Sequence, residues 1–208
     1  MQIIDLETIA ISTVAYFHFT KRSNIDSIRN NGLEPRIGDA SLHVKDKARV
    51  CYSKGLKGML GMINSFIYVM KNCSICNIPI GYRQYFKIKD FSSEEKLPQK
   101  EIYEACIKKM KDEVYLLIDA QEGVDFNIED MHGICAYDIK GKENQGIEKE
   151  KLKIVTSQKG NSVLDIVIQV YDKFIKENPR SEKSIKLLFS DLNGIIEYMK
   201  EKEEEMEL

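Results

Sequence analysis

The chain has 208 residues, of which 43% are hydrophobic and 31% are charged, a composition that can bury one substantial core. Its 31 Lys and Arg against 33 Asp and Glu give a net charge of −2, which excludes a global basic field for holding nucleic acid. No apolar run reaches the roughly 18 residues of a membrane span and no secretory leader is recognisable, so we expect a soluble, cytoplasmic protein with no membrane partner.

The first predicted strand, over residues 13–19, consists mainly of β-branched and aromatic residues, which suit a half-buried pleated surface. Side chains alternate along a strand, so Phe17 and Phe19 share one face while His18 and Thr20 share the other. If the phenylalanines point into the core, an imidazole and a hydroxyl face the opposite side. A core histidine satisfied by a backbone carbonyl is the more frequent case for a single histidine in a strand.

A short helix follows this strand. Ser23 is a plausible N-cap, and Gly32 falls where a left-handed residue ends a helix. Leu33 then folds back onto the helix, and Pro35 forbids its continuation.

A second short apolar run, over residues 49–53, leads into a helix that continues through Met70. Glycines at positions 55, 58 and 61 recur at three-residue spacing in this helix. They favour close backbone packing over direct contact with a phosphate, because neither a GxGxxG nor a Gly-Lys-Ser/Thr motif is present.

The middle of the chain mixes strands and helices. We predict an edge strand over 82–88, an amphipathic helix over 102–110, and strands over 114–118, 134–139 and 152–155. The first of these interleaves aromatic and basic residues, a composition also found on platforms for single-stranded nucleic acid.

The last third of the chain is predicted to be helical. Asn161 or Ser162 caps a helix that ends before Pro179, and Ser181 caps a second helix that runs to Met199. Such an appended pair is more often a packing or homodimer surface than catalytic machinery.

The five cysteines are odd in number and lie mostly within apolar runs, which fits free thiols in a reducing compartment. Cys73-Ser-Ile-Cys76 has the spacing of half a zinc site, yet no second pair of this kind exists. We therefore interpret the pair as structural and expect no metal.

Three motifs together resemble the front half of the ADP-ribosyltransferase-like superfamily, which includes poly-ADP-ribose polymerases, bacterial ADP-ribosylating toxins and RNA 2′-phosphotransferases. They are His18-Phe19-Thr20, the helix that ends in Gly32-Leu33, and Arg49-Val50-Cys51-Tyr52-Ser53. The resemblance covers about residues 14 to 70, a minority of the chain.

This resemblance implies an NAD site. His18 would bind a ribose hydroxyl, and the backbone at Phe19 would meet the nicotinamide amide. Tyr52 or Ser53 would line the nicotinamide pocket, into which Thr20 also faces.

The chain departs from the family pattern at the catalytic residue, because many members place a glutamate late in the domain. Glu122 follows the apolar run 114–118 and matches best by position, with Glu129 a weaker match. His132 is the other candidate, since some phosphotransferase-like members use basic residues or histidine instead. We take Glu122 and His132 as the catalytic candidates.

The fold expected from this resemblance is α+β, with a split, mainly antiparallel sheet of the ADP-ribosyltransferase type over residues 1–160 and C-terminal helices over 161–208. The leading hypothesis is NAD-dependent ADP-ribosyl transfer to a macromolecular acceptor, either protein or nucleic acid. A noncatalytic nucleotide- or protein-binding module on the same fold, associated with defence or immunity, is the alternative. RNA 2′-phosphotransfer is a third reading, for which Arg22, Arg36, Lys45, Lys47 and Arg49 would form a local phosphate patch.

Overall fold

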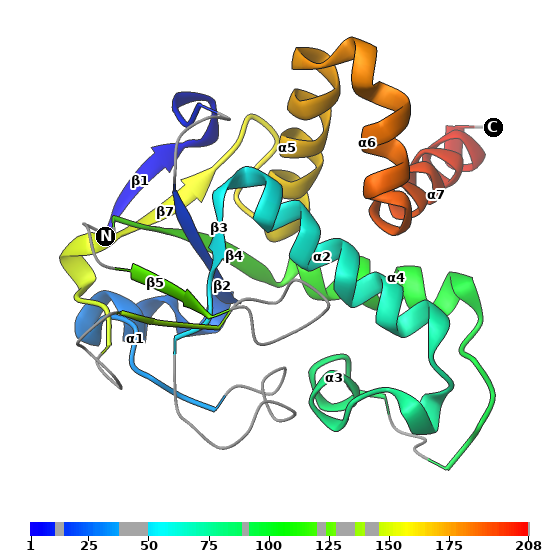
Figure 1. Ribbon diagram of the computed structural model, residues 1–208, viewed down its shortest axis with the longest axis horizontal. Coiled ribbons are helices and arrows are strands. Elements are labelled where there is room, and N and C mark those ends of the chain that lie inside the picture. The colour runs from blue at the N-terminus through cyan, green and yellow to red at the C-terminus, as the bar shows by residue number, and fades with distance from the viewer. Residues whose placement is uncertain are drawn as a thin grey trace.

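The computed structural model of the protein describes residues 1–10, 15–37, 50–88, 92–119, 124–127, 136–139 and 146–207. Within these residues the chain is α+β, with a five-stranded sheet, a two-stranded sheet and seven α-helices (Figure 1). The strands are β1 (Gln2–Asp5), β2 (Tyr16–Lys21), β3 (Ser53–Lys54), β4 (Glu113–Ile118), β5 (Val124–Asn127), β6 (Ala136–Ile139) and β7 (Leu152–Thr156). The helices are α1 (Ile25–Asn31), α2 (Gly55–Asn72), α3 (Ile80–Tyr85), α4 (Gln99–Lys111), α5 (Val163–Glu177), α6 (Glu182–Leu188) and α7 (Ser190–Glu207).

The larger sheet has the strand order β1-β7-β4-β2-β3, and β5 pairs with β6 in the smaller one. β1 runs parallel to β7, whereas β7, β4, β2 and β3 are antiparallel to their neighbours. The sheet is thus mixed, and the expectation of a mainly antiparallel sheet was wrong. The parallel edge strand β1 was not predicted, because its side chains show no buried alternation and Ile3 is 70% exposed.

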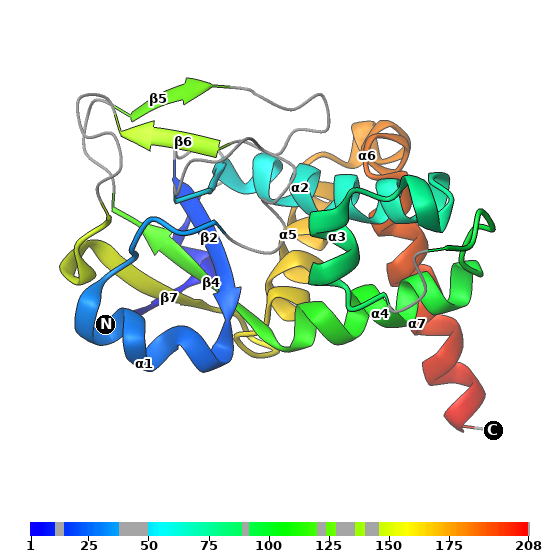
Figure 2. The same cartoon turned by 90° about the horizontal axis from the view of Figure 1, so that it is seen from below.

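The two faces of the larger sheet bury separate cores. Phe17 and Tyr115 belong to the larger core, which α2, α4, α5 and α7 complete. Leu116 and Ile154 belong to a smaller core on the other face, to which α1 contributes Ile28. Figure 2 shows α1 on one side of the sheet and α2, α4 and α5 on the other. The predicted orientation of the strand phenylalanines is therefore confirmed.

Helix α1 ends as the sequence predicts and begins differently. Gly32 follows it with a φ of 78°, in the left-handed region, and a Cβ at this position would overlap the carbonyl oxygen of Ile147. The predicted cap Ser23 lies instead in a short 3-10 helix, Arg22–Asn24, and the residue before α1 is Asn24. The turn from β2 into α1 is thus tightened by a 3-10 segment.

The segment predicted as a strand over 82–88 is helical in its first half, as α3. Tyr82, Tyr85 and Phe86 are spaced three and four residues apart, which places them on one side of a helix. All three rings contact Phe66 of α2, and the Tyr85 ring stacks on it with centroids 5.7 Å apart. This aromatic cluster, rather than strand pairing, determines the local structure.

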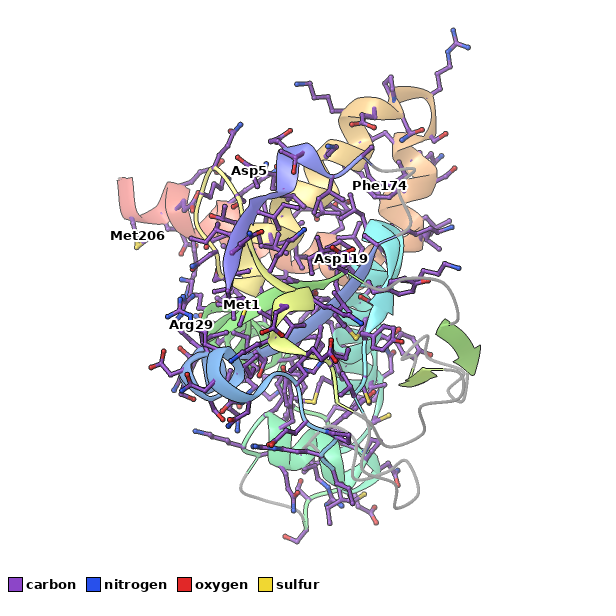
Figure 3. The ribbon with its side chains drawn as sticks, turned by 90° about the vertical axis from the view of Figure 1, so that its left-hand side faces the viewer. Met1, Asp5, Arg29, Asp119, Phe174 and Met206 are labelled. Carbon is purple, nitrogen blue, oxygen red and sulfur yellow. The ribbon has the colours of Figure 1, made fainter. Side chains whose placement is uncertain are left out.

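The C-terminal helices complete the larger core. Ser162 and Asp165 form a capping box at the start of α5, which ends at Glu177 before Pro179 as predicted. The second predicted helix is divided into α6 and α7 around Phe189. In Figure 3, Met206 marks the far end of α7, which projects away from the sheet.

None of the helices in the described ranges is both long enough and apolar enough to cross a membrane.

Candidate functional site

His18 lies near the middle of β2, on the face of the sheet that also carries the smaller core. It is directly opposite Leu116 of β4, and Thr20 is opposite Val114. The alternation predicted from the sequence therefore places the imidazole and the hydroxyl on one face, half-buried and buried respectively.

The His18 ring is fixed by a hydrogen bond to the chain before β3. Its Nδ1 is 2.6 Å from the carbonyl oxygen of Cys51, and because a carbonyl oxygen only accepts, Nδ1 must carry the proton. Burial lowers the pKa of His18 below its usual value of 6.5, and the bond to Cys51 opposes this shift only in part. At neutral pH the ring is neutral, so Nε2 is left with a lone pair that accepts hydrogen bonds.

Thr20 is 8% exposed, and its hydroxyl accepts a hydrogen bond from the Asn24 side-chain amide at 3.1 Å. This contact ties the end of β2 to the turn that starts α1. Thr20 shares the His18 face but is largely covered by that turn.

Tyr52 and Ser53 point to opposite faces of the sheet. Tyr52 is buried in the smaller core, where it meets the Tyr16 ring edge to face at 5.6 Å. Ser53 pairs with Phe17 and donates its hydroxyl to the Phe17 carbonyl oxygen at 3.5 Å. The structure therefore brings His18, Thr20 and Tyr52 to one face and leaves Ser53 on the other.

The Phe19 side chain also faces away from His18, against the rings of Phe66 and Tyr115. Its backbone lies at an edge, because β3 pairs only with Tyr16 and Phe17 and its ladder stops before His18. Within the described residues, no strand pairs with that edge of β2 at Phe19. A ligand amide could add to this edge as a further strand would.

The catalytic candidates Glu122 and His132 lie outside the described residues, as does Glu129. Among the side chains that the structure describes, which exclude those of β5 and β6, the buried carboxylates are Glu113 and Asp191. Glu113 is opposite Lys21 on the face of the larger core, and Asp191 belongs to α7. Neither shares the His18 face.

Glu113 is the centre of a buried polar cluster that the sequence did not reveal. Its Oε2 accepts the Tyr85 hydroxyl at 2.5 Å, and Lys109 Nζ lies 3.4 Å from Oε1. Burial raises the pKa of Glu113, and the hydrogen bond from Tyr85 and the charge of Lys109 counteract this in part. One sequence signal could have pointed to this cluster: Glu113 begins an apolar run and follows Lys109 by four residues.

The suggested phosphate patch is only partly described. Arg22 donates to the Asn161 side-chain oxygen at 2.9 Å, and Arg36 pairs with Glu34 at 2.7 Å. Both guanidinium groups thus have partners within the protein. Lys45, Lys47 and Arg49 lie outside the described residues.

Cys73 follows the last residue of α2 and Cys76 lies in a short 3-10 helix just after it; both are free, half-buried thiols, and the Cys76 sulfur lies 3.2 Å from the Ser74 hydroxyl. Within the described segments, no three His, Cys, Asp or Glu side chains gather where they could hold a metal ion.

Comparison with known proteins identifies no matching family model, no matching curated protein and no matching solved structure.

Proposed function

We propose that the chain binds NAD on the His18 face and transfers ADP-ribose to a macromolecular acceptor. The observation that carries this proposal is the fixed tautomer of His18, held by the Cys51 carbonyl with Nε2 as an acceptor. A ribose hydroxyl is a hydrogen-bond donor and matches that nitrogen. The motif resemblance of residues 14 to 70 supplies the class of ligand.

The residues near His18 suit such a ligand in one further respect. The edge of β2 at Phe19, with which none of the described strands pairs, offers backbone groups to an amide, as the nicotinamide carboxamide requires. Tyr52 lies on the same face, but its ring is buried in the smaller core against Tyr16, so it supports that face from within and does not form an open wall of the site. Ser53 has no place in this proposal because its side chain faces the larger core.

In NAD, the bond between ribose and nicotinamide breaks readily because nicotinamide is a good leaving group. The protein must therefore mainly position NAD and the acceptor and stabilise positive charge on the ribose. His18 would orient the ribose and is not itself a charge stabiliser while it is neutral. The charge-stabilising group is proposed to be Glu122 or His132. A carboxylate performs this task best in a site that excludes water.

A noncatalytic NAD-binding module is the second candidate. It is favoured by one observation: of the side chains that the structure describes, the two buried carboxylates, Glu113 and Asp191, lie away from the His18 face.

The first experiment is calorimetric titration with NAD, combined with an assay for released nicotinamide. His18→Asn is the informative variant, because the asparagine amide can donate to the Cys51 carbonyl as Nδ1 does but has nothing at the position of Nε2. We expect it to fold normally and to lose NAD binding. If His18→Asn binds NAD as tightly as the unchanged protein, the proposed site is wrong.

The second experiment separates transfer from binding. Glu122→Gln and His132→Ala are expected to lower nicotinamide release far more than NAD affinity, as loss of a transition-state interaction does. NAD binding without any nicotinamide release, unaffected by either substitution, would support the binding module instead.

A further inference from the structure

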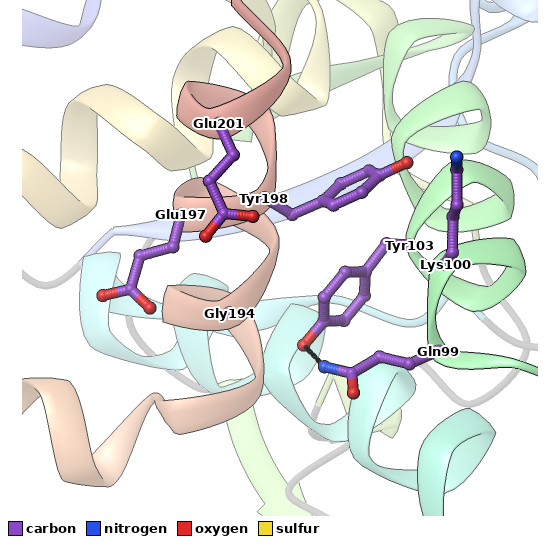
Figure 4. Close-up of a pocket in the computed structure, with 7 residues that line it drawn as sticks. All are labelled: Gln99, Lys100, Tyr103, Gly194, Glu197, Tyr198 and Glu201. Atoms are coloured by element: carbon purple, nitrogen blue, oxygen red, sulfur yellow. Dashed lines mark hydrogen bonds between the residues drawn. The ribbon is translucent and has the colours of Figure 1, made fainter. Parts of the chain in front are cut away.

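An open hollow of about 310 Å³ lies between α4 and α7, on helices distinct from the strands that carry His18 (Figure 4). Its lining residues are Gln99, Lys100, Tyr103, Gly194, Glu197, Tyr198 and Glu201. Two tyrosine rings and two carboxylates thus meet in one surface depression.

Gly194 and Tyr103 form one side of the hollow. A Cβ at Gly194 would overlap the Tyr103 hydroxyl, so the glycine allows this ring to lie directly against α7. Tyr103 is 4% exposed, and its hydroxyl accepts a hydrogen bond from the Gln99 amide at 2.6 Å. The ring is therefore held in place.

Tyr198 forms a second aromatic wall. Its ring centroid lies 5.6 Å from that of Tyr103, with the planes tilted by 53°. Its hydroxyl donates to Glu104 at 2.6 Å, which fixes the ring from outside the hollow. The two rings form a preformed aromatic corner.

Both rings already attract cations of the chain. Lys71 Nζ lies 5.9 Å from the Tyr103 centroid, and Lys202 Nζ lies 5.4 Å from the Tyr198 centroid. These lysines belong to ion pairs with Asp191 and Glu104 and do not line the hollow.

Glu197 and Glu201 stand one helical turn apart on α7, where like charges repel. Within the described residues, neither carboxylate has a basic side chain within ion-pair distance. Lys100 is the one basic residue of the lining, which leaves the lining with a net negative charge. The end of α7 beyond Glu201 adds to this field, with four further glutamates against one lysine at a helix C-terminus.

We propose that this hollow is the docking site for an arginine side chain in a basic segment of a partner protein. A planar guanidinium can stack on a tyrosine ring and donate to a neighbouring carboxylate at the same time, which a lysine ammonium does less well. Flanking basic residues of the segment would lie along the acidic surface of α7. The openness of the hollow at the surface suits a side chain that enters from outside.

The test is fluorescence anisotropy with a labelled Gly-Arg-Gly-Arg-Gly peptide, compared with its citrulline and lysine counterparts. We expect the arginine peptide to bind saturably and more tightly than either counterpart, with an affinity that falls as salt rises. The double variant Glu197→Gln with Glu201→Gln should weaken binding by about tenfold or more. The matched control, Glu203→Gln with Glu204→Gln, removes the same charge from α7 outside the hollow and should weaken binding clearly less than the first double variant does, because it leaves the contacts in the hollow intact.

Four results would overturn the proposal. They are equal losses in the two double variants, equal binding of the citrulline peptide, equal binding of the lysine peptide, and no saturable binding of the arginine peptide. Sedimentation of the protein alone tests whether a second copy of the chain occupies the hollow instead. A dimer that dissociates in the Glu197→Gln, Glu201→Gln variant would assign the hollow to that second copy. NAD binding is expected to be the same in all these variants, so the two proposals fail independently.

Discussion

The hydroxyl of Tyr85 on α3 donates to the carboxylate of Glu113 at the start of β4, with the two oxygens 2.5 Å apart. Glu113 is 2% exposed, so this bond satisfies a group that would otherwise be costly to bury. Lys109 completes the arrangement, with its ammonium 4.2 Å from the centroid of the Tyr85 ring. Three segments of the chain are thereby joined at one carboxylate.

Removal of the Tyr85 hydroxyl should destabilise the protein. Tyr85→Phe keeps the ring against Phe66 but deprives a buried carboxylate of its short hydrogen bond, and we expect a loss of about 1–3 kcal/mol in the free energy of unfolding. Urea denaturation measures it. Tyr198→Phe is the matched control, because it removes a similar tyrosine–glutamate bond at the surface and should cost clearly less. Equal losses in the two variants would show that the burial of Glu113 contributes nothing special.

Glu113 should also make the stability depend on pH. Its pKa is raised in the folded protein above the usual 4.5, so the folded state holds the proton more tightly than the unfolded state does. The contribution of the Glu113 carboxyl to the free energy of unfolding is complete below pH 4.5. It is lost as the pH rises through the pKa of Glu113 in the folded protein. We expect the unfolding free energy of the unchanged protein, minus that of Glu113→Gln, to fall over that interval. A difference that rises with pH would contradict the direction of the shift.

His18 should act in the opposite direction. Its pKa is lowered in the folded protein, so the unfolded chain takes up a proton first as the pH falls below 6.5. Stability that is present above pH 6.5 is therefore lost as the solution is acidified towards the folded pKa. Proton–carbon NMR titration of the imidazole should give a pKa below 6.5 in the folded protein. A titration at or above 6.5 would show that His18 is charged near neutrality, and the acceptor role of Nε2 would no longer hold.

Two glycines should respond oppositely to alanine. Gly32→Ala places a Cβ at a φ of 78° and against the Ile147 carbonyl oxygen, and we expect a loss of at least about 1–2 kcal/mol. Gly61→Ala lies within α2 with nothing within 4 Å of the added Cβ, and we expect a gain of up to about 1 kcal/mol. Thermal unfolding of both variants provides the measurement. A stabilising Gly32→Ala would mean that the chain does not turn there as described.

Local sequence patterns predicted much of the fold. The alternation of Phe17, His18 and Phe19 predicted the two faces of β2, and Gly32 predicted the end of α1. Asn161 and Ser162 were the two predicted caps of the next long helix, and α5 does begin after Ser162. These elements follow from steric and hydrogen-bonding rules that act within a few residues.

Other elements depend on contacts between distant segments. Tyr82, Tyr85 and Phe86 were interpreted as a strand because aromatics favour strands, yet their common contact with Phe66 requires a helix. Strand β1 could not be predicted from its exposed side chains, since its partner is β7. For the site, the sequence grouped Ser53 with His18, and only the register of β3 against Phe17 shows that Ser53 faces the other way.

The pairing of β1 with β7 also bears on the order in which the protein can assemble during its synthesis. Gln2 pairs with Lys153, so the first strand is translated 151 residues before its neighbour. Until β7 has left the ribosome, β1 has no place in the larger sheet and β4 has an open edge towards β7. The nascent chain must therefore keep β1 unpaired while β2 and β4 can already associate, and assembly of the sheet ends with a contact of high sequence separation.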